Sequence, residues 1–250
     1  REIVRCLAGC GLLPVFSHSD EAQPSASVPL FPALKDSIHI SGELAVLDPI
    51  NRRAGLRIDC SPRESKREGN GPLHYFAMLP SGEIWFHGAP ATFQDIPPGT
   101  HVQGRFIVAP QGSETRIAPP PSDLADLIPK EDHALLIEDD VSFARRIGFQ
   151  WKVLSISKET SKLRVETVGA TTPEGPSGQM TLDFDLATRV WEKGALVSMD
   201  RVKEGALVSL NFARGINWTD REFGTEDIWL DEESLTKARE IQERRNVRYH

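Results

Sequence analysis

Four side chains in the first half of the chain could bind a soft metal ion: His74, Met78, His87 and His101. If residues 73–78 form a strand, His74 and Met78 share one face, because side chains alternate along a strand. Imidazole nitrogen together with thioether sulfur suits copper(I). We therefore treat His74, Met78 and His87 as a candidate metal site. In the alternative interpretation this face is the interior of a barrel, and His74 and Met78 pack in its core.

Two tryptophans, Trp85 and Trp191, stand at matching positions in similar segments and are candidate ligand-binding residues. An exposed indole on a strand could stack against a sugar, a nucleobase or an apolar side chain of a partner. Alternatively, each indole covers the end of a barrel or the contact between two copies.

The sequence carries no motif for catalysis. Nucleophile elbows, phosphate-binding loops, paired-histidine zinc helices and dinucleotide fingerprints do not occur in it. The acidic residues around Glu131 and Asp183 lack the glycine-containing loop of a calcium site of the EF-hand type. We predict a protein that is not an enzyme, has no catalytic residues and needs no cofactor.

Charge argues against some partners. The chain has 36 acidic residues against 29 lysines and arginines, which gives a net charge of -7. Such a chain is repelled by phosphate backbones and anionic lipid surfaces. The expected partner is an unknown protein or glycan, and nucleic acid is disfavoured.

The first 30 residues allow three interpretations. Leu7-Ala8-Gly9-Cys10 matches the lipoprotein cleavage pattern, which would make Cys10 a lipid anchor. Cys6 to Phe16 also resembles the apolar core of a secretory signal. Both predict a periplasmic, envelope-associated or extracellular protein. A buried first strand or helix in a cytoplasmic protein is the alternative. No apolar run is long enough for a transmembrane helix.

Self-comparison shows two similar segments. Trp85, Gly88 and Ala89 align with Trp191, Gly194 and Ala195 in one ungapped register, which continues through Phe106 and Phe212. We expect an N-terminal segment at 1–37, which is a possible signal or tether, followed by a first copy at 38–109. A Pro-rich linker at 110–144 contains a short helix after Ser122. The second copy spans 145–214, and an extension at 215–250 has a helix that starts near Asp231. A continuation past His250 is left open.

Both copies have the pattern of short strands. Segments such as 56–60, 163–167 and 180–186 alternate apolar and polar residues, and turn sequences such as Pro97-Pro98-Gly99 separate them. About five strands in roughly 70 residues suits a small barrel of the OB type. The predicted fold is therefore mainly β, with two tandem OB-like five-stranded barrels.

The second copy, from Val153 through Gln179–Phe184 to Val202–Val208, resembles small OB-like barrels of the bacterial envelope, including the periplasmic copper-binding family. In that family a His, two Met and a stacked Trp hold the metal. Met180 matches one Met, but Leu182 replaces the second and the second copy has no His. The resemblance therefore implies the fold and does not extend to copper in this copy.

Three hypotheses follow for function. The first is a non-catalytic envelope or extracellular binding or structural module. The second is copper binding by the first copy, and the third is single-stranded nucleic-acid binding by analogy with OB folds. The copies agree at core and turn positions and differ at polar ones, where His74 and His87 face Met180 and Lys193. The first copy is thus the better candidate for a specific site.

Overall fold

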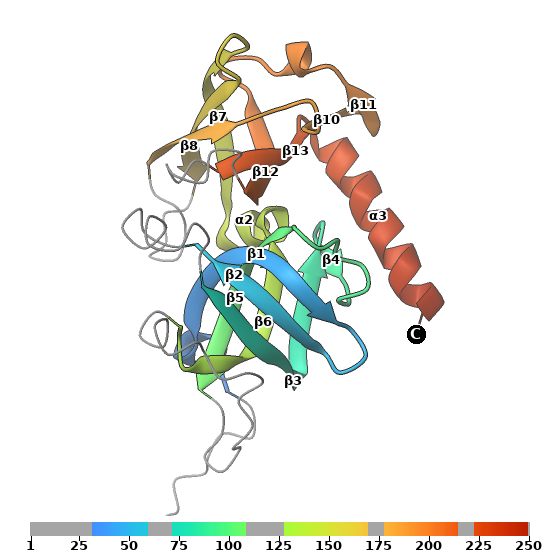
Figure 1. The fold of residues 1–250 in the computed structure, drawn as a ribbon. Helices are drawn as coiled ribbons and strands as arrows, with labels where there is room; N and C mark the ends of the chain where they lie inside the picture. Colours follow the sequence, from blue (N-terminus) through green and yellow to red (C-terminus); the bar gives the residue numbers. More distant parts are fainter. Residues whose placement is uncertain (1–31, 60–71, 109–127, 170–177, 215–222, 250) are drawn as a thin grey trace, which may run out of the picture. The chain divides into compact units, whose positions relative to one another are not determined.

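A computed structural model describes residues 32–59, 72–108, 128–169, 178–214 and 223–249. The predicted fold class is confirmed: the chain forms two closed five-stranded β-barrels, one after the other in sequence (Figure 1). We call them barrel one and barrel two.

Barrel one is built from β1 (Ile38–Asp48), β2 (Arg53–Ile58), β3 (Leu73–Phe86), β5 (His101–Val108) and β6 (Glu131–Asp139). Its strands close in the order β1-β2-β3-β6-β5 and back to β1. Only one of these five contacts, β3 with β6, is parallel. This is the order of an OB barrel. The short β4 (Ala89–Pro90) forms a hairpin with the end of β3, and a 3-10 turn, η1 (Leu34–Asp36), precedes β1.

Barrel two repeats this order with β7 (Phe149–Ser157), β8 (Lys162–Gly169), β9 (Gln179–Asp183), β10 (Arg189–Glu192), β12 (Leu207–Arg214) and β13 (Phe223–Trp229). Both β9 and β10 pair in parallel with β13. Together they take the place that β3 holds alone in barrel one. A hairpin arm, β11 (Ala195–Val197), and a 3-10 turn, η2 (Met199–Arg201), follow β10.

Each barrel extends beyond the copy seen in the sequence. The closing strand β6 comes from the segment expected to be linker, and β13 comes from the expected extension. The helix α2 (Asp140–Ile147) begins in the expected linker and ends in the expected second copy. The physical reason is the parallel closure, because a parallel strand must return through a long connection and so lies far from its partner in sequence. The short helix expected after Ser122 lies outside the described residues. The C-terminal helix is confirmed as α3 (Glu232–Tyr249).

The barrel interiors follow from the alternation of the strands. In barrel one Leu44, Leu56, Phe76 and Phe106 are fully buried, and the rings of Phe76 and Phe106 meet edge to face. Barrel two buries Trp151, Leu163, Leu182, Leu210 and Ile228 in the same way. Removing each such side chain from water contributes about 1.5–3 kcal/mol. The interiors are therefore packed cores.

The helix that follows barrel one fastens the β3–β4 hairpin. Asp139 caps α2: its side chain accepts the backbone N–H of Ser142 (3.0 Å) and also that of His87 in the hairpin turn (3.1 Å). The Ser142 hydroxyl accepts the N–H of Gly88 (2.8 Å). The turn needs this support because His87 and Gly88 both have positive φ, as in a type I′ turn.

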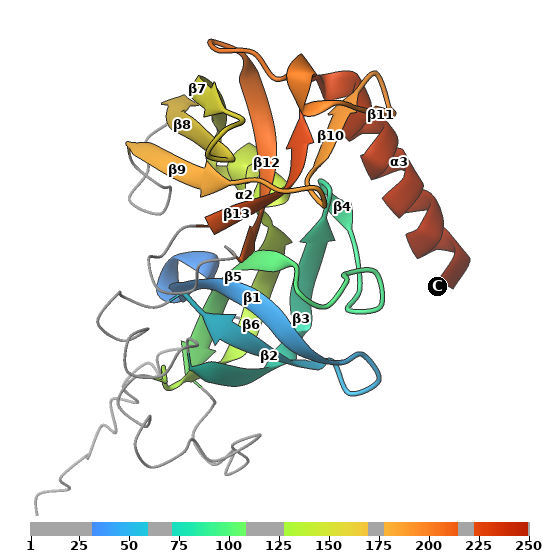
Figure 2. The same ribbon diagram turned by 45° about the horizontal axis from the view of Figure 1, so that its top comes forward.

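Barrel two uses the same arrangement at the start of α3. The Asp231 carboxylate accepts the N–H of Ser234 (2.7 Å) and that of Lys193 in the β10–β11 turn (2.7 Å). The Ser234 hydroxyl accepts the N–H of Gly194 (2.8 Å). We call this arrangement of an aspartate, a serine and a two-residue turn the hairpin clamp. In both Figure 1 and Figure 2, α3 lies beside β10 and β4, and it contacts both strands.

The hairpin clamp makes a stability prediction. Ser142→Ala and Ser234→Ala should each lower the free energy of unfolding by about 1–2 kcal/mol, because a buried serine hydroxyl is lost and the turn N–H loses its acceptor. Urea denaturation would measure this, with Glu240→Ala on an exposed part of α3 as the control. Losses no larger than that of the control would contradict the clamp.

Candidate functional site

The structure places His74 and Met78 inside barrel one. Both side chains are buried, and the His74 ring packs against Phe76 and edge to face against Phe106 (5.4 Å between centroids). Burial lowers the pKa of His74, which favours the neutral ring. Its Nε2 has no hydrogen-bond partner among the described residues.

His87 lies at the opposite end of β3, in the hairpin turn. Its ring stacks on Phe86 (3.9 Å between centroids) and meets Trp229 of barrel two edge to face (5.4 Å). His74 and His87 therefore have different neighbours. In the part of the chain that the structure describes, no three His, Cys, Asp or Glu side chains come together to hold a metal ion. The geometry adds no support for the copper hypothesis, and Cys10 lies outside the described residues.

His101 belongs to a buried ionic cluster where the two barrels meet. Its Nδ1 donates to Asp140 (2.9 Å) and its Nε2 donates to Asp59 (2.9 Å). The ring also packs edge to face against Phe223 of barrel two (5.3 Å). Burial alone would lower the pKa of His101, but the two carboxylates raise the pKa well above its usual value. The side chain is therefore an imidazolium.

Asp140 connects the barrels through the same cluster. Besides His101, its carboxylate accepts the side-chain N–H of Gln103 (2.7 Å) in barrel one and the backbone N–H of Phe212 (2.8 Å) in barrel two. Both nitrogens of His101 are engaged by carboxylates, so the ring has no free lone pair with which to accept a proton. The cluster links the two barrels through Asp140.

The two tryptophans predicted to bind a ligand differ in their surroundings. Trp191 stacks on Trp229 with their centroids 5.4 Å apart and the rings 13° from parallel. Its Nε1–H donates to the buried carboxylate of Asp227 (2.7 Å). Trp191, Trp229 and Leu235 of α3 belong to one apolar cluster. Trp191 is thus a packing residue between barrel two and α3.

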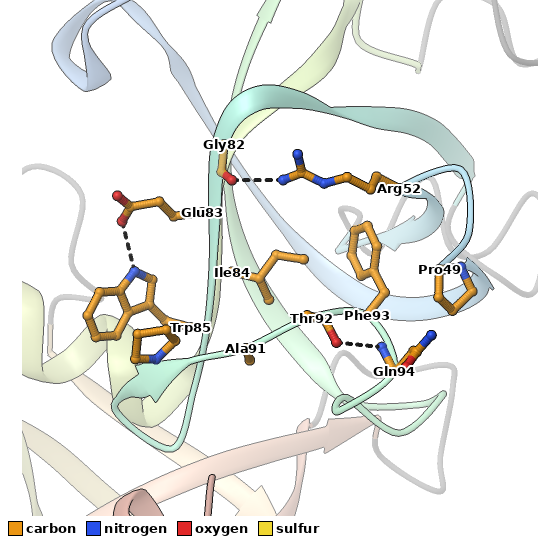
Figure 3. Close-up of a pocket in the computed structure, with 11 residues that line it drawn as sticks. Pro49, Arg52, Gly82, Glu83, Ile84, Trp85, Ala91, Thr92, Phe93 and Gln94 are labelled. Atoms are coloured by element: carbon orange, nitrogen blue, oxygen red, sulfur yellow. Dashed lines mark hydrogen bonds between the residues drawn. The ribbon is translucent and has the colours of Figure 1, made fainter. Parts of the chain in front are cut away.

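Trp85, by contrast, lines two hollows on barrel one. The first hollow has a volume of about 620 Å³ and is bordered by the β1–β2 turn, β3 and the segment after β4. In Figure 3 the Trp85 indole and the Glu83 carboxylate lie together on one side of β3, and Trp85 donates its N–H to Glu83 (3.0 Å). Arg52 lies on the other side, where its guanidinium donates to the carbonyls of Pro80 and Gly82.

The second hollow has a volume of about 500 Å³ and lies between β3, β6 and α2. Trp85 and Glu83 border it as well, with Leu34, Leu136, Arg145 and Arg146. The Arg146 guanidinium forms an ion pair with Glu138 (2.8 Å), whose pKa is raised by burial and lowered in part by that arginine. We call the two hollows together the Trp85 site.

One pair of equivalent positions accounts for the different surroundings of Trp85 and Trp191. The strand register pairs Trp85 with Glu138 in β6, and it pairs Trp191 with Trp229 in β13. A carboxylate therefore stands in barrel one where barrel two has a second indole. Likewise, Arg146 and Ala238 lie the same number of residues after their clamp aspartates, and Ala238 packs on the tryptophan cluster. At these positions barrel two has apolar side chains that pack together. Barrel one has charged side chains, and the second hollow lies beside them.

Sequence reasoning found Trp85 but missed Glu138 and Arg146. Glu138 lies in the segment expected to be linker, and Arg146 lies at the start of the expected second copy, where no motif marked either residue. The only available signal was Asp139 followed by Ser142, which matches Asp231 and Ser234 and could have extended the alignment of the two copies.

The comparisons with known proteins add little to this geometry. No protein-family model matches the chain, and no curated protein matches it. Among solved structures, a copper(II)-containing variant of CusF from Escherichia coli is 19% identical, over 34% of this chain and 91% of that one, with a TM-score of 0.25. The two closed barrels agree with the small-barrel architecture that the resemblance implied.

A search of the described helices for a membrane span found none that is both long and apolar enough.

The buried ionic cluster makes a prediction about pH. Folding raises the pKa of His101, so protonation of this ring stabilises the folded protein. The stabilisation is fully present below the unfolded pKa of about 6.5, and it is lost as the pH rises through the folded pKa. Wild type should therefore be more stable than His101→Gln, by an amount that is largest below the unfolded pKa and shrinks as the pH increases. Urea denaturation at a series of pH values would measure the difference.

A matched control is His133→Gln, since His133 pairs with the neighbouring Asp132 away from the junction. A stability difference between wild type and His101→Gln that does not change with pH would contradict the imidazolium assignment.

Proposed function

We propose that this chain is a binding module in which barrel one carries the ligand site and barrel two supports it. The observation that carries the proposal is that the equivalent indoles of Trp85 and Trp191 have different surroundings. Trp191 is stacked and hydrogen-bonded within the protein, whereas Trp85 borders two hollows.

The composition of the Trp85 site supports binding. Ligand pockets of about 300–1,000 Å³ combine apolar and aromatic walls with a few polar groups that set orientation. Here Trp85 and Leu136 supply the apolar surface, while Glu83, Glu138 and Arg146 supply charge. All three charged groups have partners within the protein, so the site is ordered before a ligand enters. Ordering in advance lowers the entropic cost of binding.

Barrel two and α3 support the hairpin that borders this site. His87 in the hairpin turn contacts Trp229, and Arg145 at the edge of the second hollow pairs with Glu232 of α3. The β4 arm also contacts α3. These contacts favour a structural role for barrel two.

An NMR fragment screen tests the proposed function. With ¹⁵N-labelled protein, fragments that bind should shift the indole N–H signal of Trp85 and leave that of Trp191 unchanged, because only the first indole borders the hollows. Trp85→Phe and Trp191→Phe variants assign the two signals and serve as matched controls. A library in which no fragment moves the Trp85 signal would overturn the proposal.

Export to the cell envelope or beyond is the second part of the proposal, and it rests on residues 6–16 and Cys10 alone. Deletion of residues 1–30 should then leave the protein in the cytoplasm, whereas the full chain is found in the envelope or medium. Cell fractionation followed by immunoblotting measures this, and Cys10→Ala separates lipidation from export. The same location for both forms would refute export through this segment.

A further inference from the structure

We propose that the second hollow of the Trp85 site binds a planar aromatic ring, stacked on the Trp85 indole. This inference rests on the proposed function and specifies its ligand class. The argument comes from barrel two, where the equivalent position is occupied by part of the protein itself.

Barrel two shows what this face of the fold accommodates. At the position equivalent to Glu138, Trp229 lies nearly parallel to Trp191 and is almost fully buried. Val141 of α2 and Leu235 and Ala238 of α3 surround that ring pair. Two aromatic rings on neighbouring parallel strands can thus stack on this face of the fold. Offset stacking of this kind contributes about 0.5–1.5 kcal/mol beyond burial.

Barrel one keeps the first ring and replaces the second. Trp85 corresponds to Trp191, while Glu138 and Arg146 take the positions of Trp229 and Ala238. These two residues pair with each other, and the hollow of about 500 Å³ lies beside them and Trp85. A ring supplied from outside would there have the Trp85 indole and the hydrocarbon of Leu34 and Leu136 among its neighbours.

The orientation of the Trp85 indole fits this role. In barrel two Asp227 receives the indole N–H of Trp191, but register places Leu136 at the equivalent position in β6. The Trp85 N–H therefore turns to Glu83 on its own strand (3.0 Å). With its polar edge satisfied, the indole offers the incoming ring an apolar face.

A matched pair of probes separates stacking from simple burial. N-acetyl-phenylalaninamide has a planar ring, and N-acetyl-cyclohexylalaninamide has a puckered ring of similar size that is at least as hydrophobic. Stacking predicts that the planar probe binds about two- to tenfold more tightly at Trp85, whereas burial alone favours the cyclohexyl probe or neither. Titration followed through the Trp85 indole N–H signal restricts the measurement to this site.

The source of the ring is resolved by comparing indole with N-acetyl-tryptophanamide. Tighter binding of the amide indicates a ring presented by a peptide chain. Equal binding indicates that a small aromatic molecule is sufficient. Both results support the inference.

A variant that reproduces barrel two gives an independent test. Glu138→Trp combined with Arg146→Ala should fill the hollow with the protein's own ring, weaken binding of the planar probe by at least about tenfold, and add an exciton couplet to the circular dichroism spectrum from a second stacked indole pair. The couplet is a readout that a misfolded variant would not give. The control is Glu204→Gln, an exposed residue of barrel two, with unchanged probe binding expected.

Equal binding of the planar and cyclohexyl probes would overturn this inference and leave the proposed function standing. So would a filled variant that shows the couplet yet binds the planar probe as wild type does. If no fragment of any class perturbs Trp85, the proposed function fails as well.

Discussion

The hairpin clamp is the constraint on which the arrangement of both barrels depends. In each barrel one aspartate at the start of a helix accepts N–H groups both from the helix and from a type I′ turn, and a serine one turn later accepts the next N–H of that turn. The helix N-terminus follows directly after the closing strand, so the clamp ties this strand to the hairpin next to it. The same hydrogen bonds therefore hold the closing strand in the barrel and position the helix that follows it.

The same clamp also determines where a site can form. It attaches the helix N-terminus to the hairpin turn in the same way in both barrels. What lies beside the equivalent indole then depends on a few side chains. Trp229 and Ala238 pack on Trp191 in barrel two, whereas Glu138 and Arg146 border a hollow beside Trp85 in barrel one. The two barrels share the hairpin clamp and differ at a few side chains. These few differences make one surface a packing surface and the other a candidate binding surface.

Much of the fold could be predicted from the sequence, because alternation and turns are local properties. The strands at 56–58 and 163–167, the paired tryptophans and the helix after Asp231 are all visible in the pattern of residues. The closing strands were not visible, since β6 and β13 pair in parallel with partners from which long connections separate them. The buried acids Glu138, Asp139 and Asp140 also belong to no recognisable motif. Their partners Arg146, His87 and His101 come from other elements, and only the fold brings them together.

Asp140 has a consequence for how the molecule responds to force or denaturant. Its carboxylate receives hydrogen bonds from His101 and Gln103 in one barrel and from the backbone of Phe212 in the other. Separating the barrels would break the hydrogen bond between Asp140 and Phe212 and the ring contacts of His101 with Phe212 and Phe223. The two barrels are therefore coupled through this junction. The chain should lose its structure as one cooperative unit, and a tether at either end would transmit tension through this junction.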